Sequence, residues 1–210
     1  MRRTVLAVAL ALLTSSWAAP ASAQLGFKGG GNLSRFVGED AEDQTKTGLN
    51  FGGAFTLLGL GPISVGPELY YAQKGGVRAQ ADTTFEIGLD YVEIPLLARL
   101  TLPGRFLRPY VTGGPAYAWR LDCDVEGEDG SAPAAGECVA ADFSNRDAAI
   151  RTADRGLVLG GGLAMSFFNL GGVTLDARMV RGLARITEGQ NGPDVKNHAL
   201  SLMLGYSFGW

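Results

Sequence analysis

A single histidine limits the catalytic chemistry that this chain could perform. His198 is the only histidine among the 210 residues, so a His-based triad or an imidazole metal site would have to use it. Ser201 lies three residues further on, and in an extended strand this spacing places the two side chains on opposite faces. The sequence contains no nucleophile elbow, zinc-ligand spacing or phosphate-binding glycine loop. We therefore predict no catalysis, metal or cofactor, and lipid hydrolysis centred on His198 is the weaker alternative.

Charged residues placed at alternate positions among small residues could form an ion-pair network. Glu68 and Glu93 fall on segments that would be neighbours, and Asp176 and Arg178 share one strand face. Inside a narrow lumen such charges must pair, because an unpaired buried charge is costly. We expect a network that closes and stiffens a small barrel, and the alternative is a gated polar path for ions or small solutes. The predicted interior network contains Lys28, Glu68, Lys74, Glu93, Arg99, Arg120, Asp176 and Arg178.

An acidic segment carries both cysteines of the chain. Between Asp122 and Asp142 there are seven acidic residues and no basic one. The run DCDVEG resembles the start of a calcium loop, but Pro133 occupies the position where that loop needs a bidentate acid. We therefore interpret the segment as a solvated acidic loop, with a loose divalent-cation site as the alternative. Because an exported chain meets an oxidising compartment, we predict a disulfide between Cys123 and Cys138.

Eight segments of alternating apolar and polar character must position these residues. Short turns rich in Gly, Pro and Asn follow every second segment, and longer polar connections occupy residues 38–46, 75–84, 122–154 and 187–196. The alternation of short and long connections is typical of outer-membrane barrels. The predicted strands cover residues 25–36, 47–58, 62–74, 85–102, 108–121, 155–168, 172–184 and 197–210.

The two faces of these strands differ in a way that distinguishes a membrane barrel from a soluble one. One face carries Leu, Val, Ile and Phe, whereas the other carries Gly, Ala, Ser and Thr together with the charges above. An eight-stranded interior has room only for small residues and a few long ones, so we place the small face inside and the apolar face against lipid. A soluble lipocalin-type barrel would reverse the two faces. The prediction is an all-β, eight-stranded antiparallel up-and-down transmembrane β-barrel, closed so that no strand edge is left.

Aromatic residues near the strand ends suggest two belts at the membrane interfaces. We assign Phe106, Tyr110, Phe167, Phe208 and Trp210 to the short-turn rim, and Tyr71, Phe85, Tyr91, Tyr117 and Trp119 to the long-loop rim.

The N-terminus has the features of a secretory signal peptide. Arg2 and Arg3 precede an apolar stretch, and Ala21-Ser22-Ala23 forms a small-x-small cleavage site, so residues 1–23 are the predicted signal peptide and residues 24–210 the barrel domain. Loss of the two arginines lowers the net charge from −3 to −5, which argues against a nucleic-acid partner. With 31 glycines and no long helical pattern, the remainder is predicted to be exported to the outer membrane as one all-β domain.

Several motifs together resemble one family of bacterial proteins. The succession GFKGGGNLS, GLNFGGAF, VGPELYYAQKG, LDYVEIPLLARL, RPYVTGGPAYAW, LDARMVRGL and LMLGYSFGW is similar to the PorT-like outer-membrane β-barrel proteins over nearly the whole mature chain. The most specific part is YVEIPLLAR, residues 91–99. The resemblance implies an eight-stranded outer-membrane barrel, and the named members imply a link to protein secretion. The C-terminus resembles the signal that the barrel-assembly machinery reads, with Gly205, Phe208 and Trp210 as its residues and Met203 in place of the usual polar residue.

These observations define the expected function and partners. We expect a monomeric outer-membrane barrel with a structural or surface-interaction role through its extracellular loops. A narrow pore and an accessory factor in protein secretion are the alternatives. The expected partners are outer-membrane lipid, the barrel-assembly machinery during biogenesis and an unidentified extracellular or envelope ligand.

Overall fold

The computed structural model describes residues 25–38, 43–80, 83–127, 139–140, 148–149, 151–167, 171–185 and 195–208. The predicted signal peptide, Cys138, Trp210 and most of the acidic segment lie outside these residues. Within the described ranges, no helix is long and apolar enough to cross a membrane.

Eight long strands and three short ones make up the described chain. The short strands are β3 (Leu58–Leu60), β7 (Val139–Ala140) and β8 (Ala148–Ala149). The long strands are β1 (Leu25–Gly38), β2 (Asp43–Phe55), β4 (Ile63–Gln80), β5 (Thr83–Thr101), β6 (Leu107–Gly127), β9 (Ala153–Ser166), β10 (Gly172–Gly182) and β11 (Val195–Phe208).

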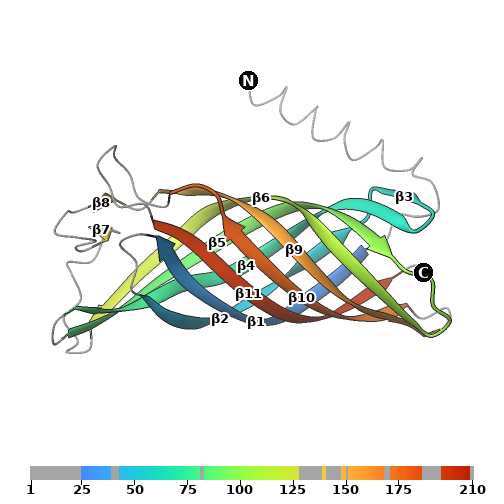
Figure 1. The fold of residues 1–210 in the computed structure, drawn as a ribbon, viewed down its shortest axis with the longest axis horizontal. Coiled ribbons are helices and arrows are strands. Elements are labelled where there is room, and N and C mark those ends of the chain that lie inside the picture. Colours follow the sequence, from blue (N-terminus) through green and yellow to red (C-terminus); the bar gives the residue numbers. More distant parts are fainter. Residues whose placement is uncertain are drawn as a thin grey trace, which may run out of the picture.

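The long strands close into one barrel (Figure 1). The sheet runs β2-β1-β11-β10-β9-β6-β5-β4-β3, and an additional pairing between β2 and β4 joins its ends. Every pairing is antiparallel, and Leu25 of β1 lies opposite Phe208 of β11. The first and last strands are therefore neighbours. The start of β1 and the end of β11 lie at the same rim. The predicted eight-stranded antiparallel barrel is confirmed.

The side chains alternate between the lumen and the outer surface as the two-face pattern predicts. On β11, Ala199, Ser201 and Met203 are buried, whereas Leu200, Leu202 and Leu204 are 54%, 59% and 63% exposed. The same alternation holds along β10, where Asp176 and Arg178 face inward. The outer wall therefore consists of exposed large apolar residues, which only a lipid environment would cover favourably.

The strands extend further on the long-loop side than the sequence pattern indicates. Residues 75–84 are expected to be a loop, but β4 continues to Gln80 and β5 starts at Thr83, with paired residues as far as Gln80 and Thr83. The short β3 lies within the 56–62 connection and pairs with the start of β4, and Gly61 between them has a φ of 60°. Backbone pairing does not require apolar side chains, so loss of the apolar alternation does not end a strand here.

Two tyrosines do not occupy the belts that we expect. Tyr91 and Tyr110 are 1% and 3% exposed and lie inside the barrel. Each has the strand parity of an inward residue, Tyr91 with Glu93 and Tyr110 with Thr112, and this parity takes precedence over position near a strand end. The assignment of Tyr91 and Tyr110 to interface belts is therefore wrong.

Candidate functional site in the barrel lumen

A buried group of four charged residues crosses the lumen near the short-turn side. Lys28 Nζ lies 2.9 Å from Asp176 Oδ2 and 3.3 Å from Glu68 Oε1. Arg178 forms ion pairs with both carboxylates, through Nη1 to Glu68 and through Nε to Asp176. All four side chains are at most 5% exposed. We call Lys28, Glu68, Asp176 and Arg178 the central cluster, and it links β1, β4 and β10 across the barrel.

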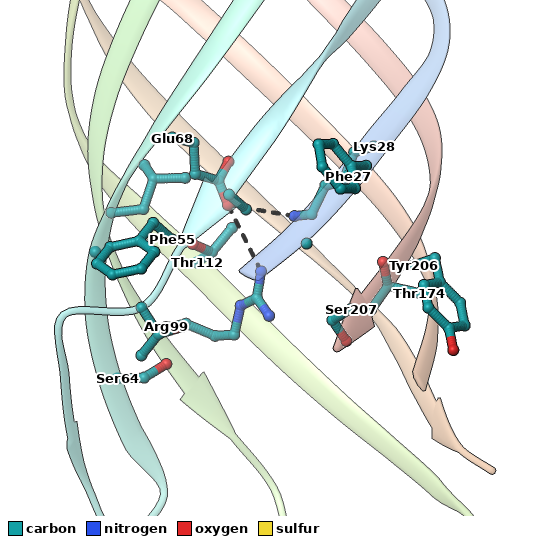
Figure 2. A pocket seen from close by; sticks show the side chains of 15 residues that line it. Phe27, Lys28, Phe55, Ser64, Glu68, Arg99, Thr112, Thr174, Tyr206 and Ser207 are labelled. Atoms are coloured by element: carbon teal, nitrogen blue, oxygen red, sulfur yellow. Dashed lines mark hydrogen bonds and ion pairs between the residues drawn. The ribbon is translucent and has the colours of Figure 1, made fainter. Parts of the chain in front are cut away.

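Two tyrosines and a third cation complete the surroundings of this cluster. Tyr70 Oη donates to Glu68 Oε2 at 2.8 Å, and Tyr110 Oη donates to Asp176 Oδ2 at 2.6 Å. Arg99 approaches Glu68 at 3.7 Å and stacks over the Tyr110 ring at 4.3 Å. Figure 2 shows Glu68 between Lys28 and Arg99, with contacts to both. Each buried carboxylate thus has cationic and hydroxyl partners, which offsets its loss of hydration.

The remaining predicted charges lie closer to the long-loop side. Lys74 forms a buried ion pair with Glu93, and its Nζ lies 5.6 Å from the centre of the Tyr91 ring. Arg120 pairs with Tyr91 in the strand register, but its buried Nη1 atom has no hydrogen-bond partner. Among the described residues, the eight predicted charges therefore separate into the central cluster with Arg99, the Lys74–Glu93 pair, and Arg120, which forms no ion pair with the others.

Apolar layers separate and cover the two charged groups. Leu97, between Glu93 and Arg99 on the inner face of β5, packs in one layer with Ala116, Val158, Val180 and Ala199. On the long-loop side of Glu93, a second layer contains Phe36, Ile87, Leu89, Tyr91, Ala118 and Val195. The charged groups are therefore stacked alternately with apolar layers along the barrel axis.

A small cavity lies between the central cluster and the short-turn rim. Its volume is about 50 Å³, and its lining includes Gly26, Ser64, Arg99, Thr174 and Ser207. Figure 2 shows Arg99 extending across this space below Glu68. A single water needs roughly 10–15 Å³ measured in this way, so the cavity has room for a few waters but not for an organic solute.

Close-fitting glycines make room for the long side chains of the cluster. A Cβ added at Gly205 would lie 2.7 Å from Lys28 Cγ and 2.5 Å from Thr174 Oγ1. A Cβ at Gly162 would lie 2.6 Å from the Tyr110 hydroxyl. The predicted role of Gly205 as part of an insertion signal stays a prediction, but the structure gives this residue a packing role.

The two residues considered for catalysis point in different directions. His198 is partly exposed on the outer face of β11. Ser201 is buried in the lumen, where its Oγ donates to Asn32 Oδ1 at 3.1 Å and accepts from Asn50 Nδ2 at 3.3 Å. The two side chains therefore cannot act on one substrate. Among the described residues, no group of three or more His, Cys, Asp and Glu side chains could hold a metal ion.

The predicted charge network omits several polar lumen residues. The strand pattern already places Asn32, Asn50 and Tyr70 on the inward face, whereas the buried Tyr110 and Asp154 are expected elsewhere. Including every inward polar residue, and not only the charged ones, would have added the first three to the network. The predicted disulfide stays a prediction because Cys138 lies outside the described residues, as do Trp210 and the acidic residues beyond position 127.

A closed barrel with an apolar outer wall and a polar, plugged lumen defines an integral membrane β-barrel of the outer-membrane type. The chain belongs to the family described by the outer membrane protein beta-barrel domain, whose model matches residues 5–208. It is thus an outer-membrane barrel protein. No curated protein matches the chain significantly.

Similarity to a solved structure, Neisserial surface protein A, supports the fold. The barrel is similar to Neisserial surface protein A, with a TM-score of 0.51 and 10% identity, covering 89% of this chain and 97% of that one. Ail of Yersinia pestis, in complex with sucrose octasulfate, gives a TM-score of 0.46 and 13% identity over 89% and 99% of the two chains. The N-terminal barrel of Pseudomonas aeruginosa OprF gives 0.39 and 15% over 88% and 97%.

Proposed function

We propose that the protein is a non-enzymatic outer-membrane barrel that acts as a structural or surface-interaction protein through its long-loop side. The observation that carries this proposal is the plugged lumen. Charged groups with mutual partners and two apolar layers fill the interior between the rims. Because the cavity beside Arg99 holds only a few waters, an ion would have to displace the central cluster in order to pass.

Conductance in planar bilayers tests the closed lumen directly. We expect the wild-type barrel, inserted at a density confirmed by immunodetection, to show no single-channel steps. A Glu68→Ala/Arg178→Ala double variant removes the ion pair that joins β4 and β10 across the lumen and serves as the comparison. Reproducible unitary steps in the wild-type protein would contradict the proposal and support the narrow pore.

The long-loop side offers the surface on which a partner would bind. The β4–β5 hairpin is stabilised there by the Tyr71–Asp90 hydrogen bond of 2.5 Å and the Lys46–Glu86 ion pair of 2.9 Å. We expect replacement of residues 128–147 with a short Gly-Ser linker to leave the barrel heat-modifiable and to abolish cross-linking to an envelope or extracellular ligand. Unchanged cross-linking would place the interaction elsewhere.

Within the family, we propose a PorT-like protein, and a role as an accessory factor in protein secretion is the corresponding candidate. Support comes from residues 91–99, YVEIPLLAR. This motif contributes Tyr91, Glu93, Leu97 and Arg99 to the lumen. It therefore encodes part of the interior, and conservative changes that keep its strand parity should preserve the barrel. An unchanged profile of secreted proteins after deletion of the gene would reject the secretion role.

A further inference from the structure

Three basic side chains lie side by side on the outer wall of the barrel. Arg35 of β1 and Arg181 of β10 each lie opposite His198 of β11 in the strand register. Both arginines are exposed and His198 is partly exposed. Directly opposite residues in antiparallel strands have Cβ atoms roughly 4.5–5.5 Å apart. We call Arg35–His198–Arg181 the basic row. It places one arginine on each side of the single imidazole.

The part of the chain that the structure describes supplies no counter-charge to this row. Among the described residues, the charged side chains near His198 are those of Arg181, Arg35 and Lys196, all of them basic. Among the described residues, no carboxylate forms an ion pair with Arg35, Arg181 or His198, whereas Lys28, Lys74 and Arg178 in the lumen each have one. Like charges directly opposite each other destabilise a sheet. An anion from outside the chain would relieve this repulsion.

The basic row lies near the long-loop end of the apolar wall, with the exposed Leu183 two residues beyond Arg181. Two residues closer to the short-turn side, the same three strands carry Leu33, Leu200 and Met179, which are 46%, 54% and 48% exposed. Phe208, at the opposite rim, is ten residues from His198 on β11. Ten residues span about 34 Å along a strand, or about 26 Å along the axis at the ~40° tilt of such barrels. This height matches the ~25 Å apolar band of membrane barrels.

The position of the basic row relative to the apolar band and its positive charge together identify the ligand chemistry. We propose that the basic row binds the phosphate of an anionic lipid headgroup in the leaflet on the long-loop side. Guanidinium groups bind phosphate oxygens in a bidentate manner. Their aliphatic stems would lie along the Leu33–Leu200–Met179 row while the charged ends reach the headgroup layer. This site lies on the wall of the barrel and is separate from the loops to which we assign surface interaction.

Native mass spectrometry on the full-length barrel tests this site. The protein is released from phosphatidylcholine nanodiscs that contain diphosphoryl lipid A as the probe. We expect wild-type protein to retain the phosphorylated lipid and Arg35→Gln/Arg181→Gln to retain at least about tenfold less. The charge-preserving Arg35→Lys/Arg181→Lys variant should retain an intermediate amount. Heat-modifiable migration on gels establishes that each variant is folded before it is compared.

Two further arms make the result specific. Arg105→Gln removes an exposed arginine from the turn on the opposite side and should leave retention unchanged, and an equal loss in this control would overturn the proposal. Free inorganic phosphate at millimolar concentration should not displace the lipid from wild-type protein. Full displacement by phosphate would also overturn the proposal, because it would indicate a small-anion site. Equal retention of phosphatidylcholine and lipid A would overturn it as well, because it would indicate an unselective surface.

Discussion

Glu68 is the residue at which the cations of the lumen converge. Its two oxygens contact Lys28 and Arg178, accept from the Tyr70 hydroxyl and lie within 3.7 Å of Arg99. A neutral side chain at this position would leave Asp176 as the only carboxylate for the two buried cations of the cluster.

We expect Glu68→Gln to destabilise the barrel by about 3–5 kcal/mol, the usual cost of breaking a buried ion pair by removing one partner. The measurement is the urea midpoint of unfolding in vesicles, followed by tryptophan fluorescence and gel migration. Glu86→Gln is the matched control, because the Glu86 side chain is 48% exposed in its pair with Lys46. Exposed pairs contribute about 0–1 kcal/mol. Equal effects of the two variants would show that the central cluster contributes no more than a surface pair.

Two glycines on neighbouring strands provide a second test at the level of single residues. Gly205 faces the lumen against Lys28 and Thr174, whereas a Cβ at Gly31 would meet no atom within 4 Å. We expect Gly205→Ala to lower the unfolding midpoint by the equivalent of about 1–3 kcal/mol, typical of overpacking, and Gly31→Ala to leave it nearly unchanged. If both variants are neutral, the cluster is looser than its contacts indicate.

At the level of elements, β11 is the strand that lies between β1 and β10 in the barrel wall. It pairs with β1 over fourteen residues and with β10 over ten. Its end is aromatic, since Phe208 packs against Phe27 and Tyr206 with ring centroids 6.2 Å and 4.9 Å away. These contacts lie at the rim where the first and last strands meet.

We predict that deletion of residues 208–210 blocks assembly but not export. The deletion removes Phe208 and two residues outside the described ranges, and with them the predicted signal for the assembly machinery. The measurement is heat-modifiable migration of outer-membrane fractions, with immunodetection in the periplasm as the check on export. The control is a substitution at the same rim, Phe106→Ala in the 102–106 turn, because Phe106 packs on Phe167 and lies outside the terminal strand. A normal heat-modifiable barrel after the deletion would contradict this role.

At the scale of the whole molecule, the fold fixes which connections share a side. Leu25, Phe208, the 102–106 turn and the 56–62 turn lie at one rim, and the β4–β5 hairpin lies at the other. Export through the periplasm and assembly from that side would leave the short turns periplasmic.

We therefore expect an epitope tag inserted between Ala81 and Asp82 to be accessible to antibody on intact cells, and a tag inserted after Gly104 to be accessible only after the outer membrane is permeabilised. Both insertions fall between paired strands, so each should leave the closed sheet intact. The reverse pattern of labelling would show that the barrel has the opposite orientation in the membrane.

Light scattering of the purified protein checks the proposed monomer.

The amino-acid sequence by itself determined the number of strands, their approximate limits and the identity of the two faces. Side chains alternate with a period of two in any strand. The apolar face and the face of small residues could therefore be identified in each of the eight predicted strands, from 25–36 to 197–210. This local rule also placed all eight charged residues inside and separated His198 from Ser201.

Only the tertiary structure decided which residues meet across the lumen and which charges lack partners. The shear and tilt of a closed barrel set contacts between strands that are not neighbours, so Arg178 on β10 reaches Glu68 on the far wall. Lys74 instead pairs with Glu93 on the adjacent strand β5. A bulge between Asp90 and Tyr91 shifts the register of β5 and β6, and alternation in a single strand cannot reveal such a shift. The basic row likewise arises from the pairing of three strands, because Arg35, Arg181 and His198 are distant in sequence and become neighbours only when the barrel closes.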